Sequence, residues 1–220
     1  MRRQAIVVGL GQFGMALATS LAEKGVEVLA IDNDEDHVRA AAPIVAEAMC
    51  MDATDESALA RTNPGQRDVC VCAIGNEARE ASIISTALLK QLGAKRLVSR
   101  ATDPLHARIL RLVGAHEVVN PEQAFGQRFA TRLIYSDVVD EIVLGPDLVL
   151  TELRPPDSFV GRSLADLQLP RRFDVTVVAV RRPDQDAIDL PSPSRPLEAG
   201  DLLVLVSRPG AVAKLLEKIS

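Results

Sequence analysis

The sequence is poor in aromatic residues. It has no tryptophan, one tyrosine and five phenylalanines, which together make 3% of its 220 residues. A core must therefore be built from Val, Leu, Ile and Ala, which is typical of a buried parallel sheet. Few rings are left to stack on nucleic-acid bases, and a net charge of −5 gives no excess of cations to hold a duplex. We therefore expect no nucleic-acid partner.

Cysteine and histidine are also scarce, with three of each. The cysteines lack the spacing of a zinc site, and Cys70 and Cys72 fall in one apolar run. Small buried hydrophobic side chains are the simpler interpretation, and a redox or metal role is the alternative. The histidines, His37, His106 and His116, are scattered in the first part of the chain, which favours surface positions. The last 75 or so residues contain none, so no acid–base pair for a dehydrogenase is visible there.

Long apolar runs are missing. No stretch approaches the ~20 residues that a membrane-spanning helix needs, and no secretory signal precedes the first apolar run. The sequence predicts a soluble, cytoplasmic protein that reaches a membrane through a partner.

The strongest motif is a glycine turn close to the start of the sequence. The apolar run from Ala5 to Val8 leads into Gly9-x-Gly11-x-x-Gly14, and a helical pattern follows. In a dinucleotide-binding turn the first glycine permits the bend, the second lets a pyrophosphate approach the backbone, and the third lets the helix pack on the strand. The free N–H groups of the helix then hold the phosphates. An ordinary strand–helix turn without a ligand is the alternative.

A carboxylate follows at the expected distance. The second apolar run, residues 26–31, ends at Asp32, which lies 18 residues after Gly14. An acid at this strand tip accepts hydrogen bonds from ribose hydroxyls and repels a 2′-phosphate, which argues against NADP. The alternative role is an N-cap for the next helix.

The alternation of strands and helices continues to about residue 133. Six strands alternating with helices predict an α/β fold with an open, doubly wound parallel sheet of the Rossmann type. The expected strands cover residues 5–8, 26–31, 46–51, 68–74, 96–100 and 117–119, and the last helix covers 123–133.

Ligands bind at the carboxyl edge of such a sheet, so the strand ends matter most. Arg100 is the cation at a strand end, where it can balance phosphate charge. A surface salt bridge is the alternative for this arginine. Glu122 follows Pro121, where the helix dipole by itself favours an acid.

The pattern changes after residue 135. We expect a nucleotide-binding domain over 1–135, a linker over 136–145 and a small α+β lobe over 146–220. The lobe should contain strands at 148–153, 173–180 and 201–207 and a closing helix at 211–219.

Several motifs in this order resemble one family. They are Val8-Gly9-Leu10-Gly11-Gln12-Phe13-Gly14, Leu29-Ala30-Ile31-Asp32, Met51-Asp52-Ala53-Thr54, Ala73-Ile74-Gly75-Asn76, Asn120-Pro121-Glu122, Val160-Gly161-Arg162-Ser163-Leu164 and Leu197-Glu198-Ala199-Gly200-Asp201-Leu202. Together they resemble the RCK (regulator of potassium conductance) family, whose Ktr and Trk members are cytosolic nucleotide-binding gating subunits of potassium transporters. The resemblance covers essentially the whole chain, as an RCK N-terminal domain followed by an RCK C-terminal lobe.

The resemblance implies that ATP, ADP or NAD(H) binds without chemistry. The implied cofactor-binding residues are Gly9, Leu10, Gly11, Gln12, Phe13, Gly14, Asp32, Asn33, Asp52, Ala53, Thr54, Ala73, Ile74, Gly75, Asn76 and Arg100. Glu122 falls where Ktr subunits place a carboxylate for a cation, which is Mg²⁺, Ca²⁺ or Na⁺. Where many Ktr subunits have an arginine, this chain has Gln12, which argues against strong discrimination of ATP from ADP.

The resemblance also implies partners. It predicts a potassium-transporting membrane subunit and a homo-oligomer, an octameric ring built from dimers, peripheral to the inner membrane. Apolar helix positions such as Ile84, Phe125 and Phe129 are candidate subunit contacts, or ordinary core. The C-terminal lobe resembles one that binds cyclic di-AMP in some relatives, with Val160, Arg162, Arg172 and Phe173 as the residues concerned. An NAD-dependent dehydrogenase or an NADH redox sensor remains the alternative function.

Overall fold

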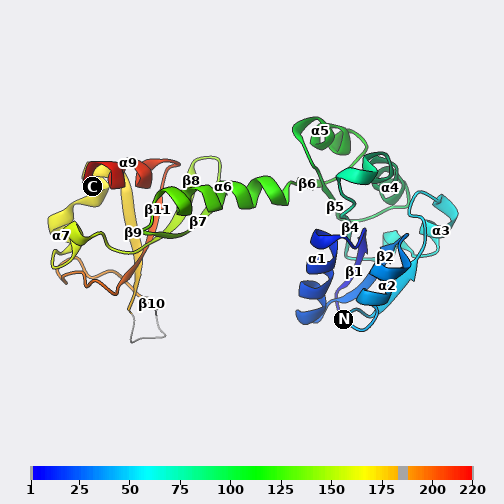
Figure 1. Cartoon of the computed structure of the whole chain (residues 1–220), viewed down its shortest axis with the longest axis horizontal. Helices are drawn as coiled ribbons and strands as arrows, with labels where there is room; N and C mark the ends of the chain where they lie inside the picture. The colour runs from blue at the N-terminus through cyan, green and yellow to red at the C-terminus, as the bar shows by residue number, and fades with distance from the viewer. Residues whose placement is uncertain (1, 183–187, 220) are drawn as a thin grey trace. The chain divides into compact units, whose positions relative to one another are not determined.

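The computed structural model describes residues 2–182 and 188–219 and divides into two compact units, Met1–Glu122 and Gln123–Ser220 (Figure 1). The side chains of Asn76, Ile188 and Asp189 are also outside the described part. Each unit has its own sheet and its own buried core. Within the described ranges, every helix is too short or too polar to span a bilayer.

The first unit is built on a six-stranded parallel sheet with the order β3-β2-β1-β4-β5-β6. This confirms the predicted doubly wound α/β fold. The strands are β1 (Gln4–Val8), β2 (Glu27–Asp32), β3 (Glu47–Cys50), β4 (Val69–Cys72), β5 (Leu97–Arg100) and β6 (Glu117–Val119). From β3 the chain crosses to β4, on the other side of β1, so the strand order reverses between β1 and β4. In open α/β sheets the ligand crevice lies at such a reversal.

Helices cover both faces of this sheet. They are α1 (Gln12–Glu23), α2 (Glu35–Ala41), α3 (Glu56–Ala60), α4 (Arg79–Gln91) and α5 (Pro104–Leu112), with short 3-10 turns η1 (Pro64–Gln66) and η2 (Asn76–Ala78). Alternate residues of β1 point to opposite faces. Val7 packs in the cluster that contains Ala18 of α1, whereas Ile6 packs in the cluster that contains Leu89 of α4. Burial on both faces explains why the strands are continuous apolar runs.

The cysteines follow their place in the sheet. Cys70 and Cys72 on β4 are fully buried, and burial raises the pKa of the Cys70 thiol to about 12, so it stays protonated. The prediction of small buried side chains is confirmed for these two. Cys50 lies on β3, an edge strand, and is exposed.

The second unit contains a five-stranded antiparallel sheet with the order β10-β9-β11-β8-β7. Its strands are β7 (Val138–Gly145), β8 (Leu148–Leu153), β9 (Val175–Arg181), β10 (Ile188–Asp189) and β11 (Leu202–Ser207). Its helices are α7 (Leu164–Leu167), α8 (Leu169–Phe173) and α9 (Ala211–Ile219), with the 3-10 turn η3 (Asp157–Phe159). The long helix α6 (Pro121–Ile134) begins in the first unit and ends in the second.

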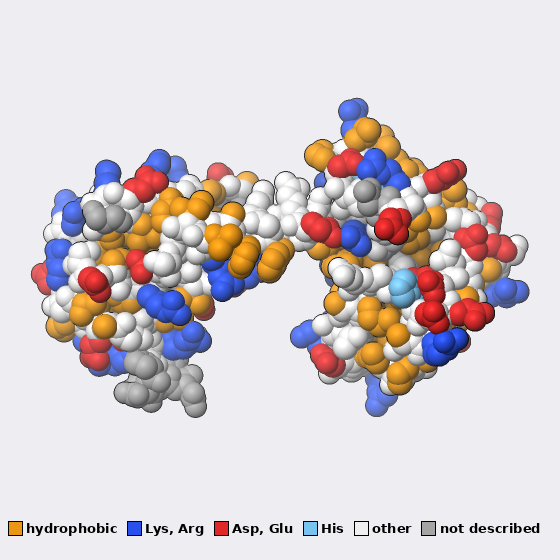
Figure 2. Space-filling model, viewed as in Figure 1, with side chains coloured by type: hydrophobic (Ala, Val, Ile, Leu, Met, Phe, Trp, Pro, Cys, Tyr) orange, Lys and Arg blue, Asp and Glu red, His pale blue; other side chains and the backbone are white. Residues whose placement is uncertain are grey.

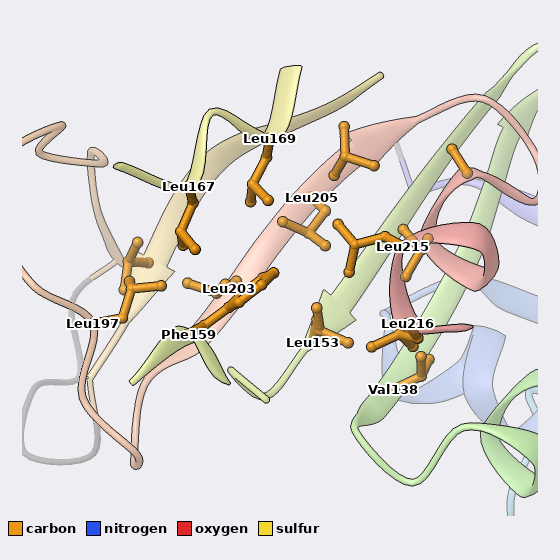
Figure 3. Close-up of a cluster of buried hydrophobic side chains, with 14 residues drawn as sticks. Val138, Leu153, Phe159, Leu167, Leu169, Leu197, Leu203, Leu205, Leu215 and Leu216 are labelled. Atoms are coloured by element: carbon orange, nitrogen blue, oxygen red, sulfur yellow. The ribbon is translucent and has the colours of Figure 1, made fainter. Parts of the chain in front are cut away.

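One hydrophobic cluster fills the second unit (Figure 3). Leu153 of β8, Leu203 and Leu205 of β11 and Leu215 of α9 belong to this cluster, and all four are completely buried. After α6, Tyr135 donates a hydrogen bond from its hydroxyl to Glu217 of α9, with an O–O distance of 3.0 Å. This contact raises the pKa of the tyrosine.

Two differences from the sequence prediction stand out in the second unit. The sequence predicts a linker over 136–145, whereas the structure places β7 there, paired with β8. This edge strand has the acids Asp140 and Glu141 at its centre and no strict alternation of burial, so it carries no clear strand signal. The strand predicted from residue 173 begins at Val175, because Phe173 closes α8 and Asp174 turns the chain with a φ of 59°.

Candidate functional site

Two glycines of the turn between β1 and α1 are required by the fold itself. Gly9 has a φ of +90°, and a Cβ there would lie 2.8 Å from the backbone nitrogen of Ile74. A Cβ on Gly14 would lie 1.8 Å from the carbonyl oxygen of Gly9. Any side chain at either position would displace backbone, so these glycines say nothing by themselves about a ligand.

Gly11 is different, because nothing in the described chain explains it. Its φ is −60° and a Cβ there would meet no atom within 4 Å. Gly11 is the N-cap of α1, which has no side-chain cap and no acid in its first turn. The helix therefore presents uncapped backbone N–H groups and the positive end of its dipole to open space, as an anion site requires.

Asp32 at the end of β2 has two roles. Its Oδ2 accepts a hydrogen bond from the Leu10 N–H at an N–O distance of 2.5 Å, and its Oδ1 accepts one from the Asp34 N–H at 2.9 Å. The first bond fixes the glycine turn against β2. Each carboxylate oxygen can accept a further bond, so Asp32 can still hold a ribose. The capping role belongs to Asp34, whose Oδ1 accepts the N–H of Asp36 at the start of α2.

His37 of α2 lies beside this carboxylate. Its Nδ1 is 3.5 Å from Oδ2 of Asp32, and its side chain is half exposed. Asn33 and Asp34 are exposed at the same rim. The rim is therefore rich in carboxylates around one imidazole.

The turn after β3 is rigid. Oδ1 of Asp52 accepts hydrogen bonds from the Thr54 N–H at 2.8 Å and the Thr54 hydroxyl at 2.7 Å. These bonds lower the pKa of Asp52. Ser85 of α4 donates its hydroxyl to the Ala53 carbonyl at 3.1 Å, which fixes the turn against the helix.

Arg100 lies at the end of β5, and its side chain reaches the glycine turn and the residues that follow β4. Its guanidinium lies 5.6 Å from the centre of the Phe13 ring, forms an ion pair with Glu122, and would lie 3.4 Å from a Cβ on Gly75. Its Nε is buried and has no hydrogen-bond partner among the described residues. Since the ion pair does not satisfy this nitrogen, Arg100 keeps donor capacity for an anion.

These elements surround one cavity of about 560 Å³ in the first unit. The predicted residues that line it are Gly9, Gly11, Gln12, Asp32, Asn33, Asp52, Ala53, Thr54, Ala73, Ile74, Gly75 and Arg100. Leu10, Phe13 and Gly14 support the turn and do not line the cavity. Asn76 belongs to η2, and its side chain is outside the described part.

Glu122 also stays out of the cavity lining and is bound to Arg100. Among the described residues, no three His, Cys, Asp or Glu side chains are gathered in a way that could hold a metal ion. A cation bound to Glu122 would therefore need further ligands that no cluster of described His, Cys, Asp or Glu side chains provides.

Sequence reasoning missed part of the lining. His37, Asp34, Met51, Glu77 and Ser85 also face the cavity. The spacing offered a signal for His37, because it lies five residues after Asp32 and hence one turn into the helix that follows. Ser85 carried no such signal, because it lies inside α4 and reaches the site only through tertiary packing.

The residues assigned to a second ligand in the C-terminal lobe are separate from this cavity. Arg172 stacks on the ring of Phe173 at 5.0 Å, and Arg162 donates to the carbonyl of Asp166 at 3.3 Å. Val160 is partly exposed.

Comparison with known proteins shows that the sequence is similar to potassium uptake proteins. Residues 5–121 match the TrkA-N domain model and residues 148–220 match the TrkA-C domain model. The chain is 31% identical over 219 residues to Ktr system potassium uptake protein C of Bacillus subtilis (strain 168), covering 100% of this chain and 98% of the relative. It is 33% identical over 217 residues to Ktr system potassium uptake protein A of Vibrio alginolyticus, covering 99% and 98%.

Solved structures agree on the fold. A structure described as the GsuK channel bound to NAD superposes with a TM-score of 0.65 at 16% identity. The match covers 98% of this chain and 39% of that one, so the chain spans about two fifths of that channel's length.

Proposed function

The chain belongs to the RCK family of proteins that join a TrkA-N domain to a TrkA-C domain, and on this premise we propose that it is a regulatory subunit of a potassium transporter. In this proposal an adenine nucleotide, ATP, ADP or NAD(H), binds in the first unit without being transformed. The protein acts in the cytoplasm, at the inner membrane, through a Ktr- or Trk-type transporter subunit. The N-terminal domain, residues 1–135, senses the nucleotide, and the C-terminal lobe, residues 146–220, completes the subunit.

Gly11 is the observation that carries the proposal. The fold does not need a glycine there, but a pyrophosphate that approaches the start of α1 does. Asp32 then reaches the ribose, the turn Asp52–Thr54 flanks the base, and Arg100 supplies the positive charge for the phosphates. The carboxylates of Asp32 and Asp34 at the rim repel a 2′-phosphate, which disfavours NADP(H).

Thermal unfolding tests the ligand class. The purified protein is heated with ATP, ADP, NAD⁺, NADH or NADP⁺, each with and without Mg²⁺ or Ca²⁺. A ligand at ~100 times its dissociation constant stabilises the folded state by about 2.7 kcal/mol. We expect stabilisation by the adenine nucleotides and none by NADP⁺. No shift with any of them would overturn the proposal, and a shift with NAD(H) alone would favour a redox sensor.

The Gly11→Ala variant tests the role of the turn. An alanine there has room and an ordinary φ, so the protein should fold as before, while the new methyl group occupies the space of the pyrophosphate. We expect the nucleotide-dependent shift to disappear. Gly145→Ala is the matched control, because a Cβ at Gly145 in β7 also meets nothing within 4 Å and lies outside the cavity. Equal nucleotide shifts in both variants would contradict the proposed phosphate position.

Regulation requires an assembly that changes shape. Helix α6 supports a homo-oligomer, because its hydrophobic side chains are exposed on the second unit (Figure 2). The rings of Phe125 and Phe129 stack on each other at 5.6 Å, and both are exposed together with Leu133 and Ile134. We propose that copies of the chain cover this face and form a ring, an octameric ring built from dimers in the family's pattern. Nucleotide binding shifts the ring only through different affinities for its two shapes.

Glu122 is the proposed cation contact in that ring. A nucleotide phosphate that recruits Arg100 would release Glu122 from its ion pair and leave the carboxylate for Mg²⁺, Ca²⁺ or Na⁺. The Glu122→Gln variant should still bind nucleotide but lose the extra stabilisation that the cation gives. Unchanged cation dependence in this variant would refute the assignment.

A further inference from the structure

A second cavity, of about 290 Å³, lies at one end of the sheet of the second unit. The strand register brings its parts together from distant places in the sequence. Leu202 at the start of β11 pairs with Arg181 at the end of β9, and Leu203 pairs with Leu153 at the end of β8. Arg154, which follows β8, and Arg181 therefore reach the same edge of the sheet.

The lining of this cavity is cationic. Arg154, Arg181 and Arg182 line it, and Asp201 is its one acidic residue. Elsewhere in this unit Arg128 pairs with Asp140, and Arg195 pairs with Glu198. Arg154 and Arg181 form no side-chain ion pair with any described residue. Two guanidinium groups that form no ion pair with the described residues lie at one small cavity, and they favour an anion, because guanidinium N–H groups match phosphate oxygens in pairs.

Asp201 gives the cavity a fixed acceptor beside these donors. The residue is buried, with a relative exposure of 3%. Its Oδ2 accepts the Glu198 N–H at 2.9 Å, and its Oδ1 is buried without a hydrogen-bond partner among the described residues. A buried acceptor left unpaired is costly. A ligand that carries a hydroxyl or a protonated phosphate oxygen would supply the missing donor.

We propose that this cavity is an anion site that takes a phosphate group, either free phosphate or the phosphate of a headgroup or small metabolite. The site is separate from the nucleotide cavity, which belongs to the first unit. It is also distinct from the cyclic-dinucleotide candidates Val160, Arg162, Arg172 and Phe173, because none of them lines it. The exposed small residues Ala199 and Gly200 leave its mouth open to a ligand.

Thermal unfolding of the full chain with inorganic phosphate tests this site, with chloride at matched ionic strength as the reference. The Arg154→Gln/Arg181→Gln double variant should bind phosphate at least about tenfold more weakly, since charge-assisted hydrogen bonds are lost. Arg171→Gln is the matched control, because Arg171 is an exposed arginine of the same unit that does not line the cavity. Both arginines of the double variant are exposed, so folding should be preserved.

Two further arms locate and identify the bound phosphate. Phosphate held in the nucleotide cavity would depend on Arg100, so in the Arg100→Gln variant the part of the response that requires Arg154 and Arg181 should remain. In the second arm, vesicles with phosphatidic acid are sedimented with the protein, at the same phosphate concentration. If binding of inorganic phosphate or of the vesicles requires Arg154 and Arg181, the result supports the site, and the ligand that binds identifies the source of the phosphate. An equal response of the wild type and the double variant, or a response no greater than in chloride, would overturn it.

Discussion

Replacing Asp32 with alanine should destabilise the first unit as well as remove a ribose contact. The carboxylate accepts hydrogen bonds from the N–H groups of Leu10 and Asp34. Leu10 is 1% exposed, so its N–H would be left without a partner, whereas Asp34 is exposed and water can replace its bond. An unsatisfied buried donor costs about 1–3 kcal/mol. We therefore expect the free energy of unfolding to fall by about 2 kcal/mol.

The melting temperature of the first unit gives the measurement. A loss of about 2 kcal/mol corresponds to roughly 6–10 °C for a domain of this size. Asp36→Ala is the control, because Asp36 is an exposed acid whose ion pair with Arg39 contributes little. Asp32→Asn keeps one acceptor oxygen and should fall between the two. If Asp32→Ala melts with the control, the Leu10 bond contributes nothing and the reasoning is refuted; if it also keeps full nucleotide affinity, the ribose assignment fails.

Three further predictions concern other parts of the chain. Burial lowers the pKa of His106 below 6.5, with Arg79 acting in the same direction and Asp103 opposing it, so the unfolded state binds the proton more readily. Stability should therefore rise with pH up to about pH 7, and His106→Asn should flatten this slope in melting curves recorded between acid and neutral pH. Leu203→Ala should cost about 2–5 kcal/mol in denaturant unfolding, because its side chain is completely buried in the core of the second unit; a smaller loss would mean that the core collapses around the gap. Phe129→Asp should lower the oligomer mass in light scattering while Gln127→Asp leaves it unchanged, and equal masses would show that α6 is not a subunit contact.

Most elements of the first unit could be predicted from the sequence because their signals are local. Gly14 is dictated by the Gly9 carbonyl within the same turn, and Asp32 lies where an apolar strand stops. Each is visible as a residue type at a fixed spacing. The carboxyl ends of parallel strands then had to meet at one edge, so the fold class followed from the alternation of elements.

What the sequence could not give depends on tertiary position. Whether Cys50 is buried depends on β3 being the edge strand, and strand order is not written in local periodicity. The strand β7 is also an edge strand, and the acids at its centre interrupt the apolar pattern by which a strand is recognised in the sequence. Arg100 and Glu122 were each assigned to a ligand, yet their mutual ion pair is visible only once β5 and the start of α6 are brought together.

Tyr135, whose hydroxyl is hydrogen-bonded to Glu217, gives the protein an intrinsic fluorescence signal. The chain has no tryptophan, and this tyrosine is its only one, so near-ultraviolet emission comes from the second unit. The nucleotide cavity of the first unit is lined by no tyrosine. Once the absorbance of the adenine ring is corrected for, a change in tyrosine emission on adding the nucleotide would report, without a label, that the second unit responds to binding.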